Sequence, residues 1–86
     1  MKAQEMFLKN QQLSTEFDLY LLDHPELANK IPNGAMVVFL PDFDKNLAKR
    51  NRSLAGKLKE KGQAVVYVKV KALSSSRLEG LSLEVA

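Results

Sequence analysis

Two runs of β-forming residues, separated by a helical segment, constrain the fold of this chain more than any other feature. Residues 35–40 are uninterrupted apolar and bounded by turn signals, which predicts a strand buried on both faces. A second strand is predicted over 63–72, where valines alternate with lysines toward the end. Between them, residues 45–61 have the helical apolar stripe Leu47, Ala48, Leu54, Ala55 and Leu58. Because strand–helix–strand connections are right-handed crossovers, the two strands are predicted to be parallel.

The flanking segments complete the predicted fold. Residues 2–23 form an amphipathic helix, a short helix follows Pro25 through Lys30, and residues 81–85 alternate as a third strand. Leu78 is out of phase with that strand, which predicts a bulge at Gly80. We therefore expect one α/β (α+β) domain over residues 1–86, with the order α-α-β-α-β-β. Its mixed sheet has three strands in the order 1-2-3, the last two being an antiparallel hairpin.

Composition excludes several classes of site. The chain has no cysteine, which rules out disulfides, thiolate zinc sites and cysteine nucleophiles. No apolar run approaches the roughly 20 residues of a membrane span, and residues 1–9 do not form a signal peptide, so we expect a cytoplasmic protein without membrane contact. The glycines are too scattered for a phosphate-binding loop. A net charge of +3, from 13 basic and 10 acidic residues, permits nucleic-acid binding without requiring it.

The polar residues that suggest catalysis have simpler structural roles. Asp42 and Asp44 follow the first strand, where an Asp-x-Asp pair can hold Mg²⁺, but we favour helix capping. His24, the only histidine, lies at a helix junction and is predicted to cap. Residues 74–76 are serines in a predicted hairpin connection, without a Gly-x-Ser-x-Gly motif. We expect no enzyme, catalytic residue, metal or cofactor; a Mg-dependent phosphate-handling enzyme at Asp42 and Asp44 is the alternative.

The predicted helix over 45–61 is strongly basic. Its only acid is Glu60, and its cations spread over about 200° of the helical wheel, so three or four can face a nucleic-acid backbone together. No aromatic residue interrupts them, as stacking on bases would require. We favour a solvated face; weak, sequence-independent binding through Lys49, Arg50, Arg52 and Lys57 is the alternative. The full set of cations is Lys45, Lys49, Arg50, Arg52, Lys57, Lys59 and Lys61.

Two asparagines interrupt apolar stripes. Asn51 lies among Leu47, Leu54 and Leu58, and Asn10 has the same kind of place in the first helix. A buried amide lowers stability unless it is hydrogen-bonded. We expect each amide to reach a loop carbonyl or the other helix; the alternative is that it fixes the register of a subunit interface.

Surplus apolar surface predicts a partner. In the sheet order 1-2-3 the first strand is an uncharged edge, which proteins normally cover. The first helix also has leucines opposite its core stripe. We therefore predict a protein-interaction module that forms a homodimer, its protein partners otherwise unidentified. The predicted interface residues are Leu8, Leu19, Leu22, Val37 and Phe39.

Several segments carry a resemblance. They are residues 12–17 (Gln-Leu-Ser-Thr-Glu-Phe), 23–26 (Asp-His-Pro-Glu), 31–34 (Ile-Pro-Asn-Gly), 39–42 (Phe-Leu-Pro-Asp) and 62–68 (Gly-Gln-Ala-Val-Val-Tyr-Val). Through them the chain resembles small uncharacterised prokaryotic proteins grouped as a domain of unknown function. The resemblance implies a prokaryotic origin and supplies no activity or site.

Overall fold

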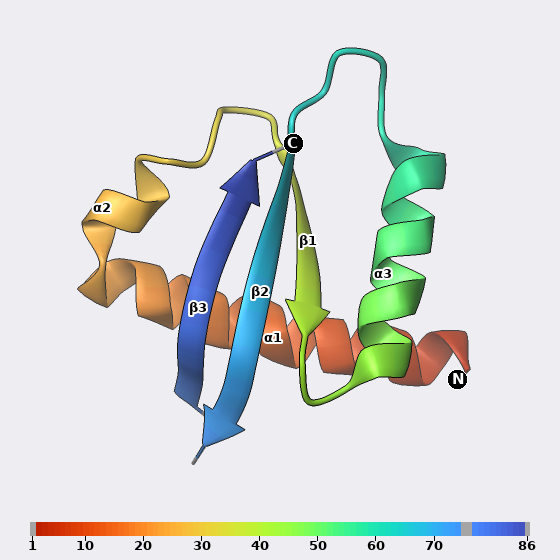
Figure 1. Cartoon of the computed structure of the whole chain (residues 1–86), viewed down its shortest axis with the longest axis horizontal. Helices are drawn as coiled ribbons and strands as arrows, with labels where there is room; N and C mark the ends of the chain where they lie inside the picture. The colour runs from red at the N-terminus through yellow and green to blue at the C-terminus, as the bar shows by residue number, and fades with distance from the viewer. Residues whose placement is uncertain (1, 75–76, 86) are drawn as a thin grey trace.

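The computed structural model describes residues 2–74 and 77–85 and confirms the predicted α-α-β-α-β-β order (Figure 1). The sheet has the order β1-β2-β3, with β1 parallel to β2 and β2 antiparallel to β3. The α/β (α+β) class and the three-stranded mixed sheet are therefore as expected. The elements are α1 (Ala3–Asp23), α2 (Pro25–Ala28), β1 (Met36–Pro41), α3 (Lys45–Leu58), β2 (Val65–Ser74) and β3 (Arg77–Val85).

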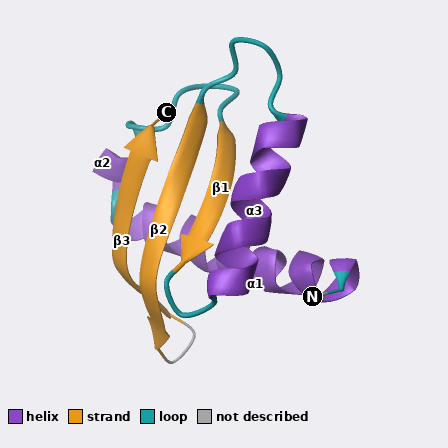
Figure 2. Ribbon diagram, turned by 45° about the vertical axis from the view of Figure 1, so that its right-hand side comes forward, coloured by secondary structure: helices purple, strands orange, loops and turns teal. Residues whose placement is uncertain are grey.

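The helices cover the two faces of the sheet unequally. Helix α1 crosses one face, whereas α3 lies alongside β1 (Figures 1 and 2). On the α1 face, Leu13 and Phe17 pack against the valines of β2, and the Phe17 ring meets the Phe39 ring edge-on at a centroid distance of 5.6 Å. On the α3 face, Val38 and Ala55 belong to a second, smaller apolar cluster. The sheet therefore has two cores, of which the one under α1 is larger.

The apolar stripe predicted for α3 is only partly covered. Leu47, Asn51 and Ala55 are buried, whereas Leu54 and Leu58 remain exposed. The reason is the place where α1 meets α3, at a contact between Asn10 and Asn51. The second half of α3 continues past that contact without α1 above it.

Some predicted boundaries were wrong because the helices end earlier and the strands run further. Helix α3 ends at Leu58, since Lys59 has extended backbone angles. Gly62 lies in the turn that follows, with φ +77°. Helix α2 ends at Ala28, two residues short of the prediction. Strand β2 continues to Ser74, into the connection predicted over residues 73–76, and β3 begins at Arg77, four residues earlier than predicted; residues 75 and 76 lie outside the described part.

Gly80 changes the phase of β3 without the predicted bulge. The β2–β3 pairing keeps one register from Val66–Val85 to Ser74–Arg77, so neither strand has an extra residue. Gly80 instead takes φ +64°, and a Cβ there would lie 2.5 Å from the Cβ of Lys71. Both facts require glycine. With this conformation Leu78 reaches the main core and is buried.

Candidate interaction site

A pair of asparagines joins the two long helices. The Asn10 Nδ2 donates to Asn51 Oδ1 at 2.8 Å, and Asn51 Nδ2 donates to Asn10 Oδ1 at 2.8 Å. Asn51 Nδ2 also donates to the Phe39 carbonyl at 2.9 Å. Asn51 is 7 % exposed, and no buried side-chain nitrogen or oxygen of the described residues lacks a partner. The prediction of internal hydrogen bonding is confirmed, and both amides are used within one chain.

On the outer edge of β1, some backbone hydrogen-bonding groups are absent or already bonded near Phe39 and Pro41, whereas those around Val37 are accessible. The amides of Met36 and Asp42 donate toward β2, so the backbone groups of the odd residues point away from the sheet. Of these, Pro41 has no N–H and the Phe39 carbonyl is bonded to Asn51. Those two features protect the edge against strand pairing. The expected uncovered edge is therefore present only around Val37. The strand was also predicted to be buried on both faces, and at Val37 this prediction was wrong because the side chain is exposed.

Beside the accessible part of the β1 edge lies an apolar groove of about 540 Å³, here called the edge groove. Residues of β1, α1 and α3 line it, and Figure 2 shows how these three elements lie relative to one another. Its most exposed apolar side chains are Phe7 (65 %), Leu58 (60 %), Leu54 (42 %) and Val37 (37 %). Asn10 and Asn51 lie at its closed end. The edge groove is thus an apolar surface that the fold leaves uncovered.

The predicted interface residues fall into two separate places. Val37 and Phe39 line the edge groove, Val37 as an exposed side chain and Phe39 as one that is mostly buried beneath α1. The three leucines share the outer side of α1 and are exposed, away from the core: Leu8, Leu19 and Leu22.

Sequence reasoning missed three residues of the edge groove. Leu54 and Leu58 have the signal of a core stripe, and only the crossing point of α1 leaves them uncovered. Phe7 lies outside the core stripe of α1, and its apolar side chain beside Leu8 was a signal that could have identified it.

Asp44 caps α3 and ties it to α1. Its Oδ1 accepts the Leu47 N–H at 3.1 Å, and its Oδ2 is 2.9 Å from Lys9 Nζ. The Lys9 hydrogen bond, followed by that of the Leu47 amide, lowers the pKa of Asp44 below its ordinary value, and the same contact raises the pKa of Lys9. Capping is confirmed for Asp44 but not for Asp42, which extends the ladder through its N–H to the Val70 carbonyl.

Within residues 2–74 and 77–85, no three His, Asp or Glu side chains gather where a metal ion could be held. Nor is any helix of that part long and apolar enough to cross a membrane.

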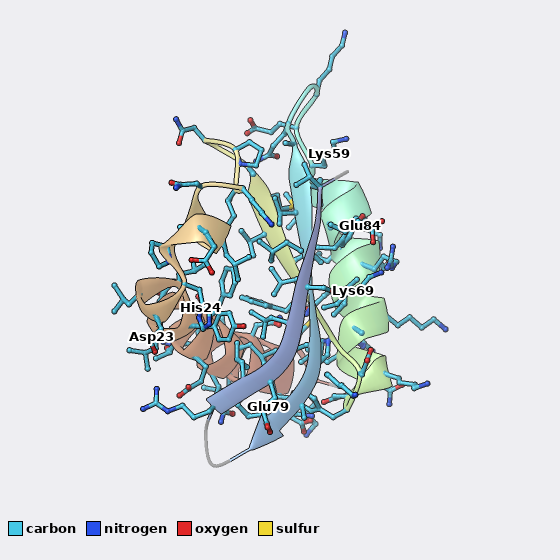
Figure 3. The ribbon with its side chains drawn as sticks, turned by 60° about the vertical axis from the view of Figure 1, so that its left-hand side comes forward. Asp23, His24, Lys59, Lys69, Glu79 and Glu84 are labelled. Carbon is cyan, nitrogen blue, oxygen red and sulfur yellow. The ribbon has the colours of Figure 1, made fainter. Side chains whose placement is uncertain are left out.

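His24 closes α1 rather than capping α2. Its Nδ1 lies 3.0 Å from the Tyr20 carbonyl, and since a carbonyl accepts, this nitrogen carries the proton. The imidazole stacks on the Tyr20 ring at 4.1 Å with an interplanar angle of 13°. Its side chain makes no capping bond to α2, so that part of the prediction was wrong. Figure 3 places His24 beside Asp23 at the end of α1.

The cations of α3 form two rows. Lys45, Lys49 and Arg52 line a hollow of about 280 Å³ together with Lys69 of β2, here called the basic hollow. Arg50 and Lys57 lie about 130° further round the helix at 3.6 residues per turn. The predicted nucleic-acid residues therefore divide between two sides. Lys59 and Lys61 follow the end of the helix.

Other contacts fix the margin of the basic hollow. Lys69 Nζ is 2.9 Å from Glu84 Oε2, and this hydrogen bond lowers the pKa of Glu84. Figure 3 labels both side chains. The Arg52 guanidinium carbon lies 4.7 Å above the centre of the Tyr67 ring. Asp42 is the one acid among the residues that line the hollow.

Comparisons with known proteins connect the chain to one group. Neither the curated proteins nor the solved structures gave a match. A family model does match residues 5–81, a range that includes all or part of every element described above. On that match, the chain belongs to the DUF5647 family, a family of unknown function.

Proposed function

We propose that this chain is a non-enzymatic protein-interaction module that forms a homodimer in a prokaryotic cytoplasm, with the edge groove as its contact surface. The observation that carries the proposal is the gathering of Phe7, Val37, Leu54 and Leu58 in one exposed groove. A large exposed apolar patch is the usual mark of a surface that another molecule covers. The exposed leucines on the outer side of α1, Leu22 among them, do not line the edge groove.

Charge favours a second copy as the occupant. Helix α1 has four acids and one lysine, whereas α3 has five cations and no acid. A two-fold axis that places α1 of one copy against α3 of the other brings two helices of opposite net charge together. The attraction is between whole helices, because at 3.6 residues per turn Asp18 is the only one of the four acids on the Phe7 side of α1. Arg50 and Lys57 lie on the side of α3 next to Leu54, where the acidic helix of the partner would arrive.

The exposure of Phe7 also supports a two-fold contact. Phe7 is both a wall of the groove and its most exposed apolar side chain, so in a two-fold arrangement each Phe7 enters the partner's groove beside Leu54 and Leu58. In a two-fold symmetric contact the same surface of each copy supplies both the protruding side chain and the groove that receives it. A stable interface buries about 800 Å² per partner, roughly a seventh of the 5867 Å² surface of this chain.

Side chains, not strand pairing, carry this contact. Joining two β1 edges would require free backbone groups along the strand, but Pro41 has no N–H and Asn51 occupies the Phe39 carbonyl. Only the part of the edge near Val37 remains accessible. Helix packing into the edge groove is therefore favoured over a continuous intermolecular sheet.

Sedimentation velocity over a concentration series tests the proposal. Wild type is expected to shift toward twice the 9.6 kDa chain mass at tens of micromolar. Leu54→Glu places a charge in the groove at an exposed site and is expected to give monomer while remaining folded by circular dichroism. Leu22→Glu is the matched control, because it makes the same change on the outer side of α1. Wild type that stays monomeric, or a dimer lost in Leu22→Glu and kept in Leu54→Glu, contradicts the proposal.

A further inference from the structure

We propose that the basic hollow binds the phosphates of single-stranded nucleic acid without reading its sequence. This inference is independent of the edge groove, since it depends on the opposite side of α3. Lys45, Lys49 and Arg52 recur at spacings of four and three residues and so form one row on the helix. Together with Lys69 they supply four cations to a single hollow, whose lining includes one acid, Asp42, while Glu84 at its margin pairs with Lys69.

Like charges in a row destabilise a helix, and α3 has no acid of its own to offset them. Anions that neutralise the row would remove that cost. The row runs about 10 Å from Lys45 to Arg52 at the helical rise, which suits successive phosphates of a strand better than a single ion. It also lies where β1 ends, the usual position of ligands in open α/β sheets.

Arg52 favours a single strand over a duplex. Its guanidinium is already oriented by the Tyr67 ring at 4.7 Å, so binding does not have to immobilise it. Arg52 is nevertheless exposed, and a guanidinium plane can stack on an unpaired base. A base within a duplex is not available for that contact.

The number of nucleic-acid phosphates that the basic hollow can contact follows from how many of its cations are not already paired with an acid. Lys69 is held by Glu84 at 2.9 Å, which leaves Lys45, Lys49 and Arg52 for the ligand. Three contacts to a single strand predict a log–log salt slope of about −2, or about 20-fold weaker binding between 50 and 200 mM salt. Losing two of the three reduces the slope to about −0.7.

Fluorescence anisotropy with a labelled oligouridylate tests whether the basic hollow binds a single strand. The titrations use the whole 86-residue chain and are repeated over a series of KCl concentrations. Lys49→Glu/Arg52→Glu is expected to lower the slope as stated and to weaken binding at low salt by at least tenfold. Lys59→Glu/Lys61→Glu is the control, because it changes the net charge equally at positions beyond the end of α3, where Figure 3 places Lys59 far from Lys69. Both variants are to be checked for unchanged thermal melting.

Three results overturn the assignment. The first is no binding by wild type at 50 mM KCl, and the second is an equal loss in the two double variants, which would reflect net charge only. The third is displacement of the strand by uridine monophosphate at the same molar concentration, which would identify a mononucleotide site. Selective loss in Lys49→Glu/Arg52→Glu, without competition from the mononucleotide, supports the proposal.

Discussion

Replacing Asn51 with alanine tests whether the asparagine pair joins α1, β1 and α3. The substitution removes three hydrogen bonds, two to Asn10 and one to the Phe39 carbonyl. At about 1 kcal/mol each, less about 0.5 kcal/mol for the better helix propensity of alanine, the free energy of unfolding should fall by about 2.5 kcal/mol. For a domain of this size that corresponds to a melting temperature lower by about 10–20 °C.

Urea unfolding, followed by circular dichroism at one low protein concentration, measures this change. Asn46→Ala is the control, since it makes the same substitution at an exposed site of the same helix and should alter stability by at most about 0.5 kcal/mol. Adding Asn10→Ala to Asn51→Ala should cost much less than the sum of the single changes, because the two side chains share two bonds. An Asn51→Ala protein as stable as Asn46→Ala would refute the reasoning.

Three further predictions concern glycines and the helix cap. Gly80→Ala should destabilise by about 2 kcal/mol or more, because φ is +64° and the new Cβ would approach Lys71, and an unchanged urea midpoint would refute this. Gly56→Ala should stabilise by about 1 kcal/mol, since the site is helical and open; a lower midpoint would be contrary evidence. Asp44→Asn should lower the free energy of unfolding above about pH 4. Because the Lys9 contact lowers the folded-state pKa of Asp44, the difference from wild type should shrink as the pH falls further. A difference independent of pH would exclude this role.

Local sequence signals were sufficient for the order of elements and the pairing of strands. The crossover from β1 to β2 has a preferred hand, and Asp44 caps α3 as its position suggested. Asn10 and Asn51 could be recognised as internally bonded because amides in apolar stripes need partners. In each of these cases a rule acting over a few residues determines the outcome.

The edge groove was not predictable in the same way, because it depends on where one helix crosses another. The stripe of Leu47, Leu54 and Leu58 is continuous in sequence, and only the crossing of α1 separates its buried part from its exposed part. Phe39 was assigned to an interface because an edge strand appeared uncovered; it lines the edge groove, but its side chain is mostly buried beneath α1. Gly80 shows a related difficulty: its φ of +64° gives the same change of phase as a bulge without the extra residue.

The most direct measurement of the edge-groove contact is an isotope-filtered NOE experiment on a mixture of ¹³C-labelled and unlabelled chains. Only contacts between different copies give signals in such a sample. The methyl groups of labelled Leu54 and Leu58 are predicted to show NOEs to the ring protons of unlabelled Phe7. Intermolecular NOEs that involve only Leu19 and Leu22, or none at concentrations in the millimolar range, would contradict the account.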